Sequence, residues 1–369
     1  MKKKTPARIL ISSARTAADI RYLCGAEPPE TAVFIQKGRT KKLIVSEMEF
    51  SRMRRSVNRG IIVLHPKMFG SSWKKGPADW IKKAGDEKRL HVTADFPLGI
   101  AEKLRRAGYR LIVSKEPSCP QREIKSGDEI SAVQIAQRAA AIAMKTAIKE
   151  IASARIGKEK VLRCGKTVLT AEAVRAVIHR ALFDLDCTAL ETIVACGPQS
   201  ADPHERGEGP LLAGEPIVID IFPKHASGYW GDLSRTVCRG SAPAELKKMY
   251  TAVKAAQAAT LKAVKAGAWT DDIHATAAAE LDRRGFETDT VNGAPQGFIH
   301  GTGHGVGLEI HEAPRISAAG HQNLRAGNVV TIEPGLYYPD IGGVRIEDTI
   351  AVTRAGFKFL APCPKKLEI

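Results

Sequence analysis

Residues 298–312 read FIHGTGHGVGLEIHE and place His300, His304 and His311 among four glycines. Glycine lets the backbone approach other groups closely and adopt conformations closed to other residues. The stretch therefore predicts a strand that leads into a loop. The alternative is a surface loop with incidental polar groups. Three of the chain's ten histidines within twelve residues favour a functional site instead.

Two aspartates precede this stretch in strand-like patterns. Asp220 interrupts the apolar run IVIDIF at 217–222, and Asp232 lies in GDLSRT at 231–236. A carboxylate in an apolar strand is costly to bury without a partner or a metal ion. Two adjacent strands joined by a turn would bring these side chains close together. The structural alternative is that Asp220 caps a turn while Asp232 pairs with Arg235.

Two glutamates follow the glycine-rich stretch. Glu333 ends the strand pattern VTIEPG at 330–335, where it has the same burial problem as the first aspartate. Glu347 follows Arg345 in GVRIED at 343–348, and a period of two places both side chains on one strand face. An ion pair between Glu347 and Arg345 is the structural alternative. Four carboxylates and one imidazole suit two divalent ions, of manganese, cobalt, iron or zinc.

The order Asp, Asp, His, Glu, Glu resembles the creatinase/prolidase/methionine aminopeptidase family, the "pita-bread" metallopeptidases. The resemblance extends over essentially the whole chain, and DIRYLCG at 19–25 resembles the start of that family's N-terminal domain. It implies an α+β fold with a pita-bread catalytic domain and a smaller α/β creatinase-like N-terminal domain. The five metal ligands implied by the resemblance are Asp220, Asp232, His304, Glu333 and Glu347.

The resemblance also implies roles for individual residues. Asp232 and Glu347 would bridge two ions, of which manganese is the first expectation, and Glu333 would act as general base. His311 would stabilise the developing oxyanion, and Arg345 would hold Glu347 in place. The residues that match the proline-specific members of the family are His204, His300, His311 and Arg345.

The implied activity is hydrolysis of the bond between an N-terminal residue and proline, by an Xaa-Pro aminopeptidase or Xaa-Pro dipeptidase. Its substrate would be a peptide with proline at the second position, and the family implies a homodimer. A methionine aminopeptidase-like or general dipeptidase activity at the same site is the alternative. The complete ligand set argues against metal-free members such as creatinase, and against a non-catalytic nucleic-acid or chromatin binding protein.

One feature departs from the family pattern. The two aspartates lie twelve residues apart, where the family usually has eleven, and FPKHAS at 222–227 replaces its usual glycine. We expect a turn that is one residue longer, with both ligands retained. Because this turn lies near the site, it is expected to affect substrate preference.

The chain is predicted to form two domains, at 1–122 and 123–369. A linker at 116–125 contains two prolines, and Ser126-Gly127-Asp128-Glu129 matches a helix capping box that opens a long helix to about Ala154. Short strands alternate with helices before the linker, and a hairpin is expected at Gly38-Arg39-Thr40, between strands Ala32–Gln36 and Lys42–Val45. After the linker, helices are expected near 170–184, 243–266 and 270–284, with a mostly antiparallel sheet. Its expected strands include Gln296–His300 and Val344–Val352.

Charge separates the same two parts. The formal net charge is +16, and residues 1–125 hold 28 basic and 12 acidic residues, a net of +16. Such a domain attracts polyanions, but its basic residues are dispersed and no nucleic-acid motif accompanies them. A solvated basic face is therefore the preferred interpretation.

The expected compartment is the cytoplasm. The seven cysteines form no C-x-x-C pair, which fits a reducing environment. The apolar run Ile9–Ile11 is too short for a secretory signal, and no stretch approaches the length of a membrane span.

Overall fold

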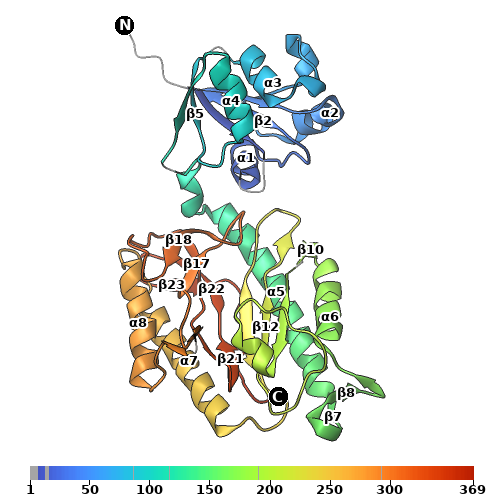
Figure 1. The fold of residues 1–369 in the computed structure, drawn as a ribbon, viewed down its shortest axis with the longest axis vertical. Helices are drawn as coiled ribbons and strands as arrows, with labels where there is room; N and C mark the ends of the chain where they lie inside the picture. Colours follow the sequence, from blue (N-terminus) through green and yellow to red (C-terminus); the bar gives the residue numbers. More distant parts are fainter. Residues whose placement is uncertain (1–6, 13–15, 86, 116, 190, 292) are drawn as a thin grey trace. The chain divides into compact units, whose positions relative to one another are not determined.

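The computed structural model describes residues 7–12, 16–85, 87–115, 117–189, 191–291 and 293–369. The chain divides into two compact units, Met1–Arg122 and Glu123–Ile369 (Figure 1). Within the described ranges, no helix has both the length and the apolar character needed to cross a membrane.

The first unit is a six-stranded mixed sheet with helices on both faces. Strand order is β4-β3-β2-β1-β5-β6, with β1, β5 and β6 parallel to one another. The predicted hairpin forms around Gly38, whose φ of 55° suits a tight turn. The six strands of the sheet are β1 (Ala7–Ile11), β2 (Val33–Lys37), β3 (Thr40–Ile44), β4 (Ile61–Leu64), β5 (Arg89–Val92) and β6 (Arg110–Val113).

Alternation along the strands explains the two helical layers. Ile9 and Ile11 face one way and pack with α3 (Pro77–Ala84) and α4 (Leu98–Arg106). Leu10 faces the other way, toward the cluster of α1 (Ala17–Cys24) and α2 (Glu47–Ser56). Successive side chains of a strand point to opposite faces, so one apolar strand supplies both cores.

The second unit begins with the long helix α5 (Gly127–Ser153). Ser126 accepts a hydrogen bond from the backbone of Glu129, whose side chain accepts one from the backbone of Ser126, and this confirms the predicted capping box. The three other helices confirm their predicted positions within three residues at each end. They are α6 (Ala171–Phe183), α7 (Ala244–Ala263) and α8 (Thr270–Arg283).

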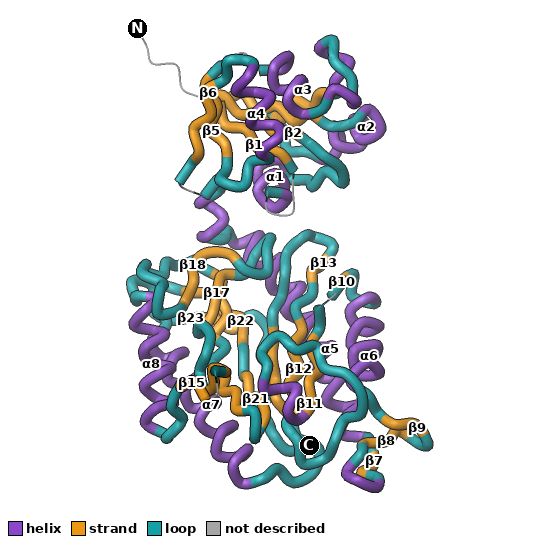
Figure 2. The backbone as a smooth tube through the Cα atoms, viewed as in Figure 1, coloured by secondary structure: helices purple, strands orange, loops and turns teal. Residues whose placement is uncertain are grey.

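The strands of the second unit form antiparallel sheets between these helices (Figure 2). The three-stranded sheet has the order β11-β12-β14 and the five-stranded sheet the order β18-β17-β19-β22-β23. Their strands are β11 (Ile193–Cys196), β12 (Ile217–Ile221), β14 (Leu233–Val237), β17 (Gly303–Gly305), β18 (Glu312–Ile316), β19 (Val329–Ile332), β22 (Asp348–Val352) and β23 (Phe357–Phe359). Two-stranded pairs are β10 (Cys187–Thr188) with β13 (Lys224–His225), β15 (Asp289–Val291) with β16 (Ala294–Gln296), and β20 (Gly335–Tyr338) with β21 (Gly342–Arg345). A small peripheral sheet contains β7 (Arg155–Ile156), β8 (Leu162–Cys164) and β9 (Thr167–Val168).

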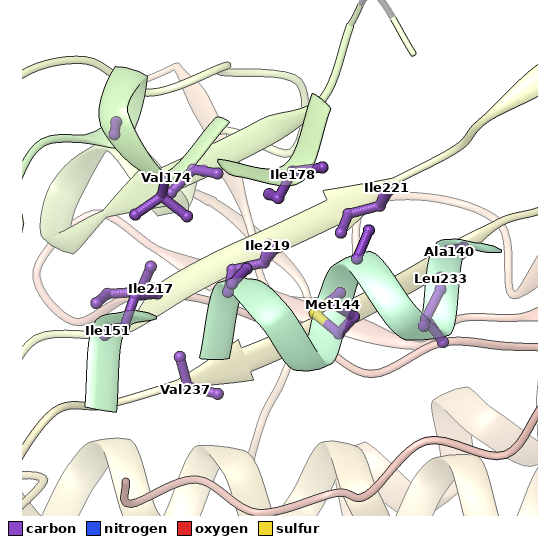
Figure 3. Close-up of a cluster of buried hydrophobic side chains, with 14 of the residues drawn as sticks. Ala140, Met144, Ile151, Val174, Ile178, Ile217, Ile219, Ile221, Leu233 and Val237 are labelled. Carbon is purple, nitrogen blue, oxygen red and sulfur yellow. The ribbon is translucent and has the colours of Figure 1, made fainter. Parts of the chain in front are cut away.

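Helices α5 and α6 cover the three-stranded sheet through a continuous apolar core (Figure 3). Ile217, Ile219 and Ile221 alternate along β12 and lie in one cluster with Met144 of α5 and Ile178 of α6. The intervening side chains of β12 leave this core on the opposite face, where Asp220 lies. Because the isoleucines of β12 pack into this core, Asp220 points away from α5 and α6.

Two predicted strands differ from the structure. The expected strand Val344–Val352 breaks between Arg345 and Asp348, so Glu347 lies in the break and does not share a strand face with Arg345. The expected strand Gln296–His300 ends at Gln296, and His300 lies in the connection to β17. Each break thus leaves a candidate site residue, Glu347 or His300, outside the regular strands.

Candidate metal centre

The second unit brings together all five predicted metal ligands. Asp220 lies on β12, Asp232 directly precedes β14, His304 lies on β17, Glu333 follows β19, and Glu347 separates β21 from β22. They come from three sheets, yet they line one cavity.

The register of two strands explains how the aspartates meet. Asp220 pairs with Ser234 across the antiparallel β12–β14 ladder. Asp232 lies two residues before Ser234 and therefore points to the same face, at the diagonal position. The one-residue-longer connection is β13 with its flanking residues, and both carboxylates face the cavity.

The ligand atoms lie close together. One potential ligand atom each from Asp232, His304 and Glu347 falls within 4.8 Å of the others. His304 Nε2 lies 3.5 Å from Asp232 Oδ2 and 3.2 Å from Glu333 Oε1. Glu347 is 1% exposed and Asp232 is 4% exposed, so this is an interior cluster of carboxylates.

The hydrogen bonds of these residues fit a bound divalent cation. Asp220 Oδ1 and Glu347 Oε1 are buried and have no hydrogen-bond partner among the described residues. His304 Nδ1 lies 3.1 Å from the carbonyl oxygen of Gly305, so a proton on Nδ1 leaves the Nε2 lone pair facing the carboxylates. Carboxylate oxygens and one imidazole nitrogen form a donor set that manganese, iron, cobalt and zinc accept.

The pKa shifts of the ligand carboxylates also indicate a site that favours a bound cation. Burial, reinforced by Glu347, raises the pKa of Asp232 well above its usual range. Burial also raises the pKa of Glu347, with Glu333 and Asp220 adding to it. For Glu333 burial acts upward, but its hydrogen bond to His304 and the charge of that imidazole lower the pKa to about 2.

We expect chelation to destabilise the protein more at pH 8 than at pH 5.5. Asp232 and Glu347 bind more protons in the folded than in the unfolded chain. Their contribution is therefore complete below the ordinary pKa values of 3.8 and 4.5, and it is lost as pH rises through the raised folded values. Bound cations remove this loss by pairing the ionised carboxylates. Thermal unfolding with chelator and with manganese, at both pH values, measures the difference; an equal gain from manganese at both would contradict it.

Arg345 connects the cluster to its surroundings. Its guanidinium donates to Asp220 Oδ2 at 2.9 Å, to Ser234 Oγ at 3.0 Å and to the Tyr337 hydroxyl at 2.7 Å. Ser234 in turn donates to Glu347 Oε2 at 2.8 Å. Arg345 thus pairs with Asp220 and is joined to Glu347 through Ser234, and the expected role of Arg345 in holding Glu347 stays a prediction.

The three additional histidines line the same cavity, which has a volume of about 750 Å³. His300 is tied to the protein, with Nδ1 2.7 Å from the Gly301 carbonyl and Nε2 2.9 Å from the Tyr337 hydroxyl. The ring of His311 packs edge-on against His304 at 4.3 Å between centroids. Burial, together with the charge of His304, lowers the pKa of His311 to about 4. His204 is exposed at the wall of the cavity.

The longer turn between the aspartates also contributes to this cavity. Phe222, the first residue of the departure from the family pattern, lies on the cavity wall together with Ile193 of the neighbouring strand. Lys224 and His225 pair with β10, and His225 Nδ1 is 2.9 Å from Ser227 Oγ, so the turn is held by its own contacts.

Three residues of the site were not found by sequence reasoning. Tyr337 is 1% exposed and joins His300 to Arg345, and Ser234 joins Arg345 to Glu347. Gln137 on α5 donates to the carbonyl oxygen of Asp232 at 2.7 Å and accepts from its amide nitrogen at 2.6 Å. Gln137 alone carried a signal, as an amide among the alanines of an otherwise apolar helix face.

Comparison with known proteins identifies the family. The model of metallopeptidase family M24 matches residues 131–354. An Xaa-Pro dipeptidase of Pyrococcus horikoshii is 30% identical over 352 residues, which cover 95% of this chain and 92% of that protein. The solved prolidase from Pyrococcus horikoshii OT3 superposes with a TM-score of 0.83 at 28% identity, covering 98% of this chain and 95% of the other. An Xaa-Pro dipeptidase from Bacillus anthracis gives 0.84 at 25% identity with the same coverages.

These similarities extend through both units and confirm the expected fold, a small α/β N-terminal domain and a pita-bread catalytic domain. The family match spans the cavity with its carboxylates and histidines. The chain belongs to metallopeptidase family M24.

Proposed function

We propose that the protein is a metal-dependent Xaa-Pro dipeptidase. The observation that supports this most directly is the buried group of four carboxylates and one histidine at the cavity, in a fold shared with Xaa-Pro dipeptidases over nearly the whole chain. A cavity of about 750 Å³ accommodates a small peptide.

Two divalent ions would be held at this cluster, with manganese as the first choice. The proposed ligands are Asp220, Asp232, His304, Glu333 and Glu347. Such ions supply Lewis-acid activation of water and polarise the carbonyl group that is attacked.

Glu333 is the proposed proton acceptor. Thr331 Oγ1 donates to its Oε1 at 3.2 Å, which fixes the side chain at the cavity wall. An ionised carboxylate at the cavity wall can take a proton from the attacking water and pass it to the departing proline nitrogen.

The neutral side chains of the cavity would bind and orient the peptide. His311, with its pKa near 4, is uncharged at pH 7 and can donate a hydrogen bond to the oxygen that gains charge during attack. His204 would contact the peptide from the exposed wall. We assign His300 a positioning role, because Gly301 and Tyr337 engage both of its ring nitrogens.

A substrate panel tests the activity. We expect metal-stripped protein supplemented with manganese to hydrolyse Xaa-Pro dipeptides, and to lose at least about 100-fold in rate without metal, since the ions activate the nucleophile. Xaa-Ala dipeptides, Xaa-Pro-Yaa tripeptides and Met-Ala-Ser serve as controls. Release from the tripeptides would indicate an Xaa-Pro aminopeptidase instead. Cleavage of Met-Ala-Ser alone would move the activity to the methionine branch.

Three further assignments complete the proposal. The two domains are 1–122, creatinase-like, and 123–369, catalytic. The protein is a homodimer, which light scattering on a sizing column tests. It acts in the cytoplasm, in keeping with seven free cysteines; a monomer, or a secreted protein in cell fractionation, would contradict these assignments.

A further inference from the structure

A buried ion pair in the second unit has no part in the chemistry proposed above. Lys125 Nζ lies 2.6 Å from Glu312 Oε1, and the two side chains are 1% and 8% exposed. Burying two charges costs free energy that their attraction only partly returns, and apolar residues of similar size are often as stable. A pair of this kind therefore suggests a role in fixing a particular conformation.

Lys125 lies near the start of the second unit, where its backbone is held in place. It directly precedes Ser126, the N-cap of α5, and its backbone nitrogen donates to the carbonyl oxygen of Gly327 at 2.8 Å. With the backbone held in this way, the ammonium group reaches Glu312, the first residue of β18. The pair thus joins the start of α5 to a segment nearly two hundred residues later in the chain.

Glu312 directly follows His311, and its carboxylate lies beneath the turn that precedes this histidine. A Cβ atom on Gly307 would lie 2.1 Å from Glu312 Oε1 and 3.0 Å from Lys125 Cε. The ion pair therefore fills the space beside Gly307, and a side chain at 307 would have to displace the end of Glu312. Gly307 and Glu312, at the two ends of this segment, therefore both border the ion pair, and His311 within the segment lines the cavity.

The backbone of this segment determines where His311 lies. In the described part of the chain the His311 ring makes no hydrogen bond, and its ring contact is with His304. Two further bonds hold the segment: the Trp230 backbone nitrogen donates to the Gly307 carbonyl at 2.9 Å, and Trp230 Nε1 donates to the Leu308 carbonyl at 3.1 Å. These bonds hold one end of the segment, and at the other end Glu312 pairs with Gly305 in the β17–β18 ladder while its side chain forms the ion pair.

We propose that the buried Lys125–Glu312 pair positions His311 by fixing the backbone of residues 307–312. Lys125 and Glu312 are positioning residues, which act on the peptide through His311. The role of His311 on substrate rests on the proposed function, whereas the fixing of the segment does not.

Two variants separate positioning from stability. Lys125→Met removes the ammonium group that faces the buried Glu312 carboxylate, so both thermal stability and kcat should fall. In Lys125→Met/Glu312→Met the buried charges are gone and stability should return close to wild type. We expect kcat of this double variant to remain about 10- to 100-fold low, since a shift near 1 Å in a catalytic group has effects of this size. KM should stay within about twofold, because the interaction is made in the transition state.

A buried pair in the first unit provides the matched control. Arg122 NH1 lies 2.8 Å from Asp19 Oδ1, with side chains 10% and 13% exposed. Arg122→Met/Asp19→Met should leave kcat and KM on dipeptides unchanged. Recovery of both stability and kcat in Lys125→Met/Glu312→Met would overturn the proposal, because the pair would then be only structural.

Amide hydrogen exchange on the metal-free protein gives a readout that needs no turnover. Residues 307–312 should exchange faster in Lys125→Met/Glu312→Met than in wild type, and at the wild-type rate in the first-unit control. If wild type cleaves no peptide, the proposed function fails while exchange still decides whether the pair fixes the segment. Unchanged exchange overturns the proposal, and so does faster exchange with wild-type kcat in an active enzyme.

Discussion

Glu333→Ala should lower kcat on Xaa-Pro dipeptides by at least about 1,000-fold, because it removes both a proposed metal ligand and the proton acceptor. The carboxylate lies 3.2 Å from His304 Nε2, accepts a hydrogen bond from Thr331, and is held ionised with a pKa of about 2. Burial instead raises the pKa of the three other proposed carboxylate ligands, Asp220, Asp232 and Glu347. Steady-state kinetics with saturating manganese measure the loss.

Glu191→Ala is the matched control for this substitution. Glu191 lines the same cavity, but its side chain is 67% exposed and lies 3.8 Å from Arg206. Exposed ion pairs contribute little, so kcat should stay within about fivefold of wild type. Full activity in Glu333→Ala would remove the residue from the mechanism.

Metal analysis of Glu333→Ala divides the two roles of the residue. Retention of two ions with loss of turnover would assign Glu333 mainly to proton transfer. Loss of an ion would assign it mainly to binding. The 3.2 Å contact with His304 Nε2, which faces the carboxylates, favours a share in binding.

Three of the five proposed ligand positions are marked locally, whereas Asp232 and Glu347 were assigned through the family resemblance. Asp220 and Glu333 stand in apolar strand patterns where an unpaired carboxylate is costly, and His304 stands between two glycines. A Cβ at Gly303 or Gly305 would lie within 2.3 Å of backbone oxygens of Thr331 or Ala313, so these glycines let β17 pack against its neighbours. Local chemistry and local packing thus leave a visible trace in the sequence.

The connections among these residues were not predictable in the same way. Arg345 and Asp220 are 125 residues apart, and their pairing depends on where β21 ends and how it meets β12. The prediction that Arg345 and Glu347 share a strand face assumed an unbroken strand. The strand breaks at Glu347, so the two side chains do not share a face. Tyr337 has no local sign of its role, because a tyrosine in an apolar strand is an ordinary core residue.

Helix α2 in the first unit shows a second limit of sequence reasoning. Its sequence, EMEFSRMRRS, buries only Met53, so it lacks the repeated apolar positions by which a helix is recognised. Ser46 is the N-cap of this helix, and its side chain accepts a hydrogen bond from the backbone of Glu49. Capping and charge at the ends define this helix, and those signals are weaker than an apolar stripe.

Arg345→Met should destabilise the metal-free protein by about 3–5 kcal/mol, because removal of one partner leaves a buried charge uncompensated. Asp220 then lacks its guanidinium partner beside the three other proposed carboxylate ligands, Asp232, Glu333 and Glu347. Saturating manganese should reduce this loss substantially, since bound cations supply the missing positive charge. Denaturant unfolding in chelator and in manganese measures both values.

Two variants make this test specific to the metal centre. Arg345→Lys keeps the charge but loses the fork that reaches Asp220, Ser234 and Tyr337 together, so it should fall between wild type and Arg345→Met in stability. Arg122 pairs with Asp19 at 2.8 Å in the first unit, and neither side chain lines the cavity. Arg122→Met should therefore lose the same stability with and without manganese. Equal losses of stability for Arg345→Met in chelator and in manganese would mean that the bound ions do not replace the charge of Arg345. Arg345 would then serve the fold, and its place among the carboxylates would not explain why an arginine is there.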